Sequence, residues 1–268
     1  MVNDSVATGG TIEFPARRVV LLGASNLTRG IATVIETACR AWGRPLDVLA
    51  ALGHGRSYGM RSTVLVRALP GIADCGLWPA LAARPAAPTA ALITDIGNDL
   101  FYGASAVTIA GWVEQCCQRL MSVDARAVMT RLPVCNIGRV RAWQYKIFRT
   151  FLYPLCRLSL DELTRGAQEL DALLLDVARR YDCRLIEPRA CWYGLDPVHI
   201  KSRQSRGAWD EILAGWAEAL DGGAPGAPLR RWVYLHTRSP EQRWLFGREQ
   251  RRNQPCGRLS DGTVVSFY

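Results

Sequence analysis

Short apolar runs alternate with longer amphipathic stretches over most of this chain. Five runs have the length and composition of strands, and they lie at 17–22, 45–52, 89–96, 125–134 and 183–188. Apolar residues recur with helical spacing at 27–43, 105–122 and 160–181. Strands that are continuously apolar and alternate with amphipathic helices predict a parallel sheet covered on both faces. We therefore expect an α/β fold, a three-layer α/β/α sandwich with a mainly parallel, flavodoxin-like sheet of about five strands.

The composition changes on either side of this alternating region. Residues 1–17 are expected to be an N-terminal extension, and 18–220 the α/β domain. The stretch DGGAPGAP (221–228) has the composition of a linker, so 221–268 is predicted to be a linker followed by a basic and aromatic extension. Within the domain, 134–160 is unusually long, aromatic and basic for its position. It predicts either a lid over a site or an added helical hairpin or dimer contact.

The composition indicates a globular protein, since 49% of the 268 residues are apolar. No apolar run reaches the length of a membrane span, and the first residues lack the basic start and apolar centre of a signal peptide. The nine cysteines are odd in number and dispersed, which argues against a disulfide framework. We therefore expect a cytoplasmic protein.

The net charge of +9 raises the question of an acidic partner. Only two of the 33 basic residues are lysines, and the arginines spread along the whole chain. The segment 230–255 interleaves basic and aromatic residues, as nucleic-acid sites and membrane-surface segments do. We favour an extension that packs its aromatic residues on the domain, so no nucleic-acid partner is expected and a peripheral membrane contact stays open. The sequence does not predict the oligomeric state.

The sequence predicts no metal site and no cofactor. It contains neither CxxC nor HExxH, and His54 and His236 have no Cys, Asp or Glu at metal-ligand spacing. The stretch GHGRSYG (53–59) approaches the dinucleotide-binding pattern, but its glycine spacing is one residue too long and Asp74 does not follow a strand.

Polar or small residues follow four of the predicted strands. GASN (23–26) follows the first, GHGRS (53–57) the second and GND (97–99) the third, and DPVH (196–199) lies beyond the fifth. The carboxyl ends of parallel strands meet at one edge of the sheet, where ligands bind in such folds. A hydroxyl, glycine backbone, an amide and an Asp/His pair are therefore expected to converge there.

These four segments, in this order, resemble the SGNH or GDSL-type hydrolase superfamily over about 18–220. The resemblance implies a serine hydrolase for a small-molecule ester or thioester, of the carboxylesterase, deacetylase or thioesterase type, which works through an acyl-serine intermediate. Ala24 replaces the Asp that commonly precedes the family's serine, and GND is one residue shorter than the commoner GxND. Both departures indicate a divergent branch.

Ser25, His199 and Asp196 are the predicted catalytic residues. A serine hydroxyl needs an adjacent base that is itself oriented by a third group. Pro197 biases Asp196 towards extended backbone, so DPVH is expected to form a turn. That turn can fold the carboxylate back to His199 Nδ1 and leave Nε2 to face Ser25.

The resemblance assigns the oxyanion hole to the backbone N–H of Ser25, the N–H of a glycine in 53–57, and the side-chain amide of Asn98. Gly55 is the better match for the glycine, with Gly53 as the alternative. Ser25 is also expected near the start of a helix that begins at about Thr28, whose dipole favours an oxyanion. Helix capping by Ser25 or Thr28, and tight turns at the glycines and at Asn98, are the simpler interpretations.

Two other functions fit the same residues. An acyltransferase would use the same triad and differ only in excluding water and binding an acceptor. A catalytically silent SGNH domain would serve as a binding module, an interpretation favoured by the altered GASN segment and the arginine-rich C-terminal region.

Overall fold

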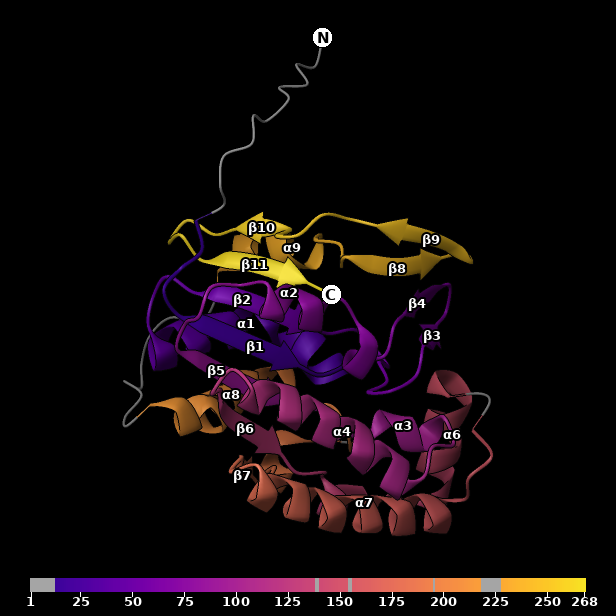
Figure 1. The fold of residues 1–268 in the computed structure, drawn as a ribbon. Coiled ribbons are helices and arrows are strands. Elements are labelled where there is room, and N and C mark those ends of the chain that lie inside the picture. The colour runs from indigo at the N-terminus through magenta and orange to yellow at the C-terminus, as the bar shows by residue number, and fades with distance from the viewer. Residues whose placement is uncertain (1–12, 138–139, 154–155, 195, 218–227) are drawn as a thin grey trace.

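The central sheet of the molecule has seven strands in the order β10-β11-β2-β1-β5-β6-β7 (Figure 1). The computed structural model describes residues 13–137, 140–153, 156–194, 196–217 and 228–268. All neighbouring strands of this sheet run parallel except β10 and β11. The strands are β1 (Arg18–Leu22), β2 (Asp47–Ala51), β5 (Thr89–Ile93), β6 (Arg126–Thr130), β7 (Arg184–Ile186), β10 (Gly257–Arg258) and β11 (Val264–Phe267). The predicted α/β fold with a mainly parallel sheet is confirmed.

Both faces of the sheet are buried, which is why the strands are continuously apolar. Successive side chains of a strand point to opposite faces. In β1, Val20 and Leu22 belong to the hydrophobic core on one face, and Val19 and Leu21 belong to the core on the other. In register, Val20 lies opposite Leu49 of β2 and Ala91 of β5, so apolar residues fill the centre of the sheet.

Helices cover each face. Residues of α2 (Leu77–Ala82), α4 (Ala106–Met121) and α7 (Leu160–Arg180) pack in one core, and residues of α1 (Ser25–Trp42), α8 (Ser202–Leu213) and α9 (Leu229–His236) pack in the other. Ser105 caps α4 by accepting a hydrogen bond from the Thr108 N–H. Ser159 and Glu162 form a capping box at the start of α7, which fixes where that helix begins.

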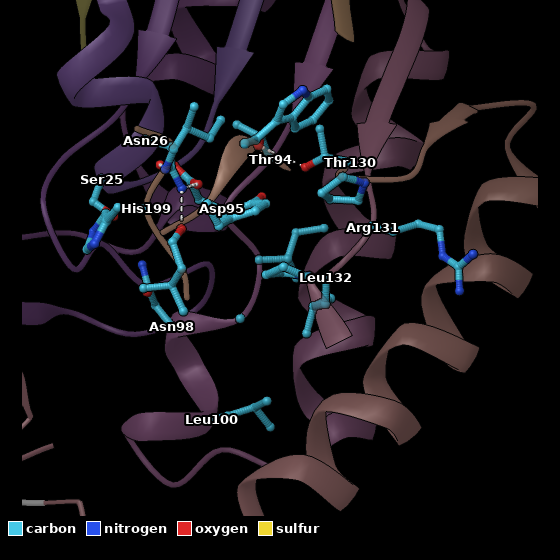
Figure 2. A pocket seen from close by; sticks show the side chains of 18 of the residues that line it. Ser25, Asn26, Thr94, Asp95, Asn98, Leu100, Thr130, Arg131, Leu132 and His199 are labelled. Carbon is cyan, nitrogen blue, oxygen red and sulfur yellow. Dashed lines mark hydrogen bonds between the residues drawn. The ribbon is translucent and has the colours of Figure 1, made fainter. Parts of the chain in front are cut away.

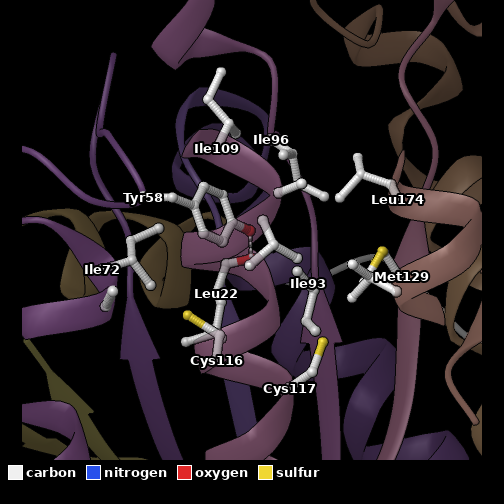
Figure 3. Close-up of a cluster of buried hydrophobic side chains, with 14 of the residues drawn as sticks. Leu22, Tyr58, Ile72, Ile93, Ile96, Ile109, Cys116, Cys117, Met129 and Leu174 are labelled. Carbon is white, nitrogen blue, oxygen red and sulfur yellow. Dashed lines mark hydrogen bonds between the residues drawn. The ribbon is translucent and has the colours of Figure 1, made fainter. Parts of the chain in front are cut away.

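One core supports the ends of the strands that carry the candidate site (Figure 3). The buried Tyr58 hydroxyl shares its one proton between the carbonyl oxygens of Thr94, at 2.7 Å, and Leu22, at 3.3 Å. Figure 3 shows this ring among apolar side chains that include Ile72, Ile96 and Ile109. A polar atom placed in the core thus joins the carboxyl ends of β1 and β5.

The sheet has two strands more than the expected number of about five. The five predicted runs form β1, β2, β5, β6 and β7, whereas β10 and β11 come from the segment assigned by sequence to a C-terminal extension. The residues of β11 are buried, and they pair in parallel with β2. A run of four residues after a charged stretch is too short to be recognised by periodicity, although its apolar composition fits a buried strand.

The buried side chain of Arg56 joins the C-terminal segment to the loop after β2. Its guanidinium donates to the carbonyl oxygens of Pro70, at 3.1 Å, and Leu52, at 3.2 Å, and also to that of Tyr268. Hydrogen bonds are the condition under which a charged group is tolerated in a protein interior. The end of β11 and the loop that carries Gly53 and Gly55 are therefore fixed to each other.

A second, antiparallel sheet was not predicted. It has the order β3-β4-β8-β9 and joins the region after β2 to the C-terminal segment. Its strands are β3 (Ser62–Val64), β4 (Arg67–Leu69), β8 (Gln242–Leu245) and β9 (Arg248–Arg251). The remaining elements are η1 (Ile72–Asp74), α3 (Asn98–Phe101), α5 (Val134–Ile137), α6 (Ala142–Leu152), η2 (Ala190–Trp192) and η3 (Ala214–Trp216).

Several sequence expectations concern residues outside this description. Residues 1–12 of the N-terminal extension and 218–227, which include most of the linker, lie outside the described residues. Within the described ranges, no helix is both long enough and apolar enough to cross a bilayer. The eight cysteines whose side chains are described are free thiols.

Candidate active site

Ser25 is the first residue of α1 and directly follows the turn after β1. The turn is tight, because a Cβ on Gly23 would lie 2.7 Å from Thr94 Cγ2. The helix starts three residues earlier than expected, and the Thr28 hydroxyl donates to the Ala24 carbonyl instead of capping the helix. Ser25 is therefore at the positive end of the α1 dipole.

The structure brings Ser25, His199 and Asp196 together. His199 Nε2 lies 2.9 Å from Ser25 Oγ, and His199 Nδ1 lies 2.6 Å from Asp196 Oδ2. The other carboxylate oxygen, Oδ1, accepts hydrogen bonds of 3.1 Å from the N–H groups of Val198 and His199. DPVH is thus a turn closed by its own aspartate, as the Asp-Pro sequence predicts.

The Asp196 carboxylate is held in its charged form. Burial opposes ionisation, but the hydrogen bond and charge of His199, together with the two backbone N–H donors, lower the pKa of Asp196 below its usual value. An ionised Asp196 can accept the Nδ1 proton of His199, which leaves Nε2 as the nitrogen that faces Ser25.

Asn98 is the first residue of α3. It lies on the same side of the site as Ser25 and His199 (Figure 2). Its Oδ1 accepts a 2.9 Å hydrogen bond from the Tyr153 hydroxyl, and its Nδ2 donates to the Arg56 carbonyl at 3.4 Å. Burial raises the pKa of Tyr153, so its hydroxyl remains a donor and fixes which end of the Asn98 amide carries the N–H groups. Tyr153 comes from the 134–160 segment, which contributes to the site in this way.

Of the two candidate glycines, Gly55 has the backbone conformation that demands glycine. Gly55 has φ +62, and a Cβ there would lie 2.6 Å from Val64 Cγ2. The Gly55 carbonyl accepts a 2.6 Å hydrogen bond from the Tyr102 hydroxyl. At Gly53 a Cβ would lie 2.3 Å from Leu69 Cδ1. Neither glycine is among the described residues that line the pocket containing Ser25, Asn98 and His199.

That pocket extends from the serine across the carboxyl ends of β5 and β6 (Figure 2). Its cavity volume is about 80 Å³. The hydroxyls of Thr94 and Thr130, 2.8 Å apart, belong to its lining. Most of the remaining side chains on the wall are apolar, including Leu100, Leu132, Leu163, Trp192 and Ile212. The described residues contain no group of three or more His, Cys, Asp or Glu placed to hold a metal ion.

Neither the protein-family models nor the curated proteins give a match to this sequence. Solved structures do. The carbohydrate acetylesterase Est24 from Sinorhizobium meliloti aligns with a TM-score of 0.51 and 12% identity, over 73% of this chain and 96% of Est24. The aryl esterase of M. smegmatis aligns with a TM-score of 0.49 and 12% identity, over 74% of this chain and 96% of its own.

This chain has the fold of the SGNH hydrolases. The psychrotrophic esterase EstA from Pseudoalteromonas sp. aligns with a TM-score of 0.47 and 9% identity, over 74% of this chain and 95% of EstA. At such identities the likeness concerns the fold alone. The family resemblance drawn from the four sequence segments is confirmed at that level.

Asp95 and Asn26 connect the two halves of this candidate site, and the sequence analysis missed both. Asp95 Oδ2 accepts hydrogen bonds from the N–H groups of Ala24, at 2.9 Å, and Leu27, at 3.1 Å, on either side of Ser25. Asp95 Oδ1 accepts one of 2.7 Å from Asn26 Nδ2. A carboxylate thus lies beside the serine turn, although residue 24 is alanine where the family commonly has aspartate.

Asn26 extends this connection to the histidine. Its Nδ2 also donates to the Val198 carbonyl at 2.9 Å, and its Oδ1 accepts from the Ile200 N–H at 2.8 Å. Both backbone groups are next to His199 in the chain. The available sequence signals were an aspartate inside a run interpreted as strand, and an amide directly after the candidate serine.

Asp99 connects the loop after β2 to the start of α3. It is fully buried, and its carboxylate accepts hydrogen bonds from the Ser57 hydroxyl and from the Tyr58 N–H, the latter at 2.9 Å. Burial raises the pKa of Asp99 to about 6, although these two hydrogen bonds oppose the rise. The contact fixes the backbone between Gly55 and Tyr58 relative to Asn98.

Replacing Asn26 with alanine is expected to lower kcat for an ester such as p-nitrophenyl acetate by about 100-fold, since small misplacements of reacting groups have effects of that order. KM should change little, because the lost hydrogen bonds join parts of the enzyme and not the substrate. Steady-state kinetics measures kcat and KM, and thermal unfolding checks that the variant is folded, with the exposed Asn253→Ala as control. A kcat within twofold of wild type would contradict the positioning role.

Replacing Asp99 with asparagine is expected to change how stability depends on pH. Because the folded-state pKa is raised to about 6, the folded protein binds the Asp99 proton more tightly than the unfolded chain, and this stabilisation is lost as pH rises through 6. The wild type should therefore lose about 1 kcal/mol relative to the variant between pH 5 and pH 8. Urea unfolding at both pH values measures the difference, with the exposed Asp124→Asn as the control for removal of a surface carboxylate.

Proposed function

We propose that the protein is a serine hydrolase that cleaves a carboxylic ester or thioester with a short acyl group, through an acyl-serine intermediate. The observation that carries the proposal is the continuous hydrogen-bonded chain from Ser25 Oγ through His199 to Asp196. A serine that only capped a helix would not need a histidine oriented by a carboxylate. The same hydrogen-bonded series of residues argues against a catalytically silent binding module.

Each residue has a defined task in this reaction. As Ser25 Oγ attacks the carbonyl carbon, its proton passes to His199 Nε2, and ionised Asp196 stabilises the imidazolium that forms. The proton then passes to the oxygen or sulfur of the leaving group, whose bond to the carbonyl carbon breaks. Water then attacks the carbonyl carbon of the acyl-serine and gives a proton to His199 Nε2. This proton passes to Ser25 Oγ as its bond to the carbonyl carbon breaks, which releases the acid and the free serine.

The negative charge on the substrate oxygen needs donors already in place. The N–H of Ser25, at the positive end of α1, is proposed as the first, and the oriented amide of Asn98 as the second. The N–H of Gly55 is proposed as the third. Its support is the left-handed backbone that glycine permits and the hydrogen bond that fixes its carbonyl to Tyr102.

The cavity beside Ser25 supports a short acyl group. Its volume of about 80 Å³ is far below the roughly 300–1,000 Å³ of pockets that take drug-sized ligands, so it suits a small group. Its wall is mainly apolar, which suits an alkyl chain better than a charged group. Acetyl to butyryl esters fit this description better than octanoyl esters do.

Replacing Ser25 with alanine is expected to abolish both activity and covalent labelling. Hydrolysis of p-nitrophenyl acetate should fall by at least about 1,000-fold, because the nucleophile is lost. Mass spectrometry after treatment with a fluorophosphonate should find the adduct on Ser25 in the wild type and none in the variant. The exposed Ser202→Ala is the matched control. A wild type that neither turns over nor labels at Ser25 would reject the proposed mechanism.

Replacing Leu132 with alanine is expected to shift the acyl preference towards longer chains. The wild type should hydrolyse p-nitrophenyl acetate and butyrate faster than octanoate, and the variant should raise the octanoate-to-acetate ratio of kcat/KM by about tenfold, the effect of extra space for one or a few methylenes. Met121→Ala, on the half-exposed outer side of α4, controls for loss of an apolar side chain elsewhere. A wild type that prefers octanoate would contradict the assigned acyl pocket.

A further inference from the structure

The turns of the β3–β4 and β8–β9 hairpins carry the apolar side chains of Leu65, Val66 and Phe246, which we call the apolar tip. Leu65 is 93% exposed, Phe246 74% and Val66 46%. The two turns are neighbours, because β4 pairs with β8 and the Phe246 N–H donates to the Val66 carbonyl at 2.9 Å. The three side chains therefore belong to a single surface.

The backbone of these turns does not favour apolar residues. Each hairpin has a two-residue loop, 65–66 between Val64 and Arg67 and 246–247 between Leu245 and Arg248. Leu65 has φ 55, Phe246 φ 49 and Gly247 φ 76. The first loop position of such turns ordinarily holds Asn, Asp or Gly, and a bulky side chain there is an outlier. Leucine and phenylalanine at this strained, exposed position therefore point to a contact outside the chain.

Arginines are frequent in the two hairpins that carry the apolar tip. The two hairpin segments, 60–69 and 241–252, contain six arginines and two glutamates. Arg67 and Arg248 directly follow the two loops, and Arg61 stacks its guanidinium over the Trp244 ring at 4.1 Å. One of the glutamates, Glu249, is paired with Arg251 at 2.7 Å. The surface thus combines exposed apolar side chains with a local excess of positive charge.

The tip is also close to the candidate active site. Val64, at the base of the β3–β4 turn, lies next to Gly55 in the loop after β2, since a Cβ on Gly55 would lie 2.6 Å from Val64 Cγ2. In Figure 1 the turn of β8 and β9 lies at the same end of the molecule as the arrowheads of β1 and β11. A partner bound to the apolar tip would therefore lie near the carboxyl ends of the parallel strands, where Ser25 is placed.

We propose that the apolar tip and its arginines form a docking surface for a membrane that contains anionic lipids. Apolar side chains enter the boundary between headgroups and acyl chains, and arginines beside them pair with lipid phosphates. Charge complementarity decides for an anionic bilayer over a second copy of this chain, because two copies would bring like-charged surfaces together. The proposal stands independently of the reaction at Ser25.

The test is flotation of the full chain with vesicles of phosphatidylcholine that contain phosphatidylglycerol, and with vesicles of phosphatidylcholine alone. The wild type should float with the anionic vesicles and much less with the neutral ones, and added salt should weaken binding. The double variant Leu65→Asn/Phe246→Asn should bind the anionic vesicles at least about tenfold more weakly, given the apolar area it no longer buries. Asparagine suits the left-handed turn positions, so thermal stability should be retained.

Two controls make the outcome specific. Val107→Ser removes an apolar side chain of 64% exposure from α4 and should leave vesicle binding unchanged. The turnover of a water-soluble ester by the double variant should equal that of the wild type, which separates docking from catalysis. Binding that is absent in the wild type, equal for both vesicle types, or unaffected by the double variant would overturn the proposal. So would a dimer, seen by sedimentation, that the double variant converts to monomer.

Discussion

The carboxylate of Asp95 accepts hydrogen bonds from the backbone on both sides of Ser25 and from the side chain of Asn26, which in turn binds the backbone on both sides of His199. Ser25 and His199 are 174 residues apart in the chain, and β1 by itself positions only the serine. The 2.9 Å separation between Oγ and Nε2 therefore depends on this hydrogen-bonded connection between the two loops. Asp95 adopts φ 59 to make it, a backbone conformation that aspartate tolerates better than most residues.

Hydrogen bonds between distant segments also position Gly55 and Asn98, on the other side of the site. Asp99 ties the loop after β2 to the start of α3, and Tyr102 and Tyr153 fix the Gly55 carbonyl and the Asn98 amide. Phe101 stacks on Tyr153 with ring centroids 4.4 Å apart, so the tyrosine itself is held by packing. Two of the three proposed oxyanion donors, Gly55 and Asn98, therefore belong to residues that a half-buried tyrosine holds by a hydrogen bond. Preorganisation of this kind is what lets donors stabilise charge without reorganising during the reaction.

The parts of the fold that were predictable from sequence are those set by local pattern. Buried parallel strands such as β1 and β5 must be apolar on both faces, so their composition reveals them. The carboxyl ends of such strands meet at one edge of the sheet, so the serine, asparagine and Asp/His segments that follow them could be expected to converge. Asp95 and Asn26 were not predicted because their roles depend on which distant backbone groups they meet. The triad and the glycine assignments stay predictions that the geometry supports.

The C-terminal segment shows why composition alone gave an incomplete picture of the molecule. Its mixture of basic and aromatic residues was interpreted as an extension packed on the domain, yet Val264–Phe267 completes the central sheet and Gln242–Arg251 supplies two strands of the second one. Arginines in this region serve several purposes. Arg231 pairs with Glu36 of α1, Arg238 lies over the Tyr234 ring at 4.4 Å, and Arg248 remains exposed beside Phe246. The net charge alone therefore does not identify a binding surface, because several of these arginines contact residues of the same chain and Arg248 is exposed beside an apolar side chain.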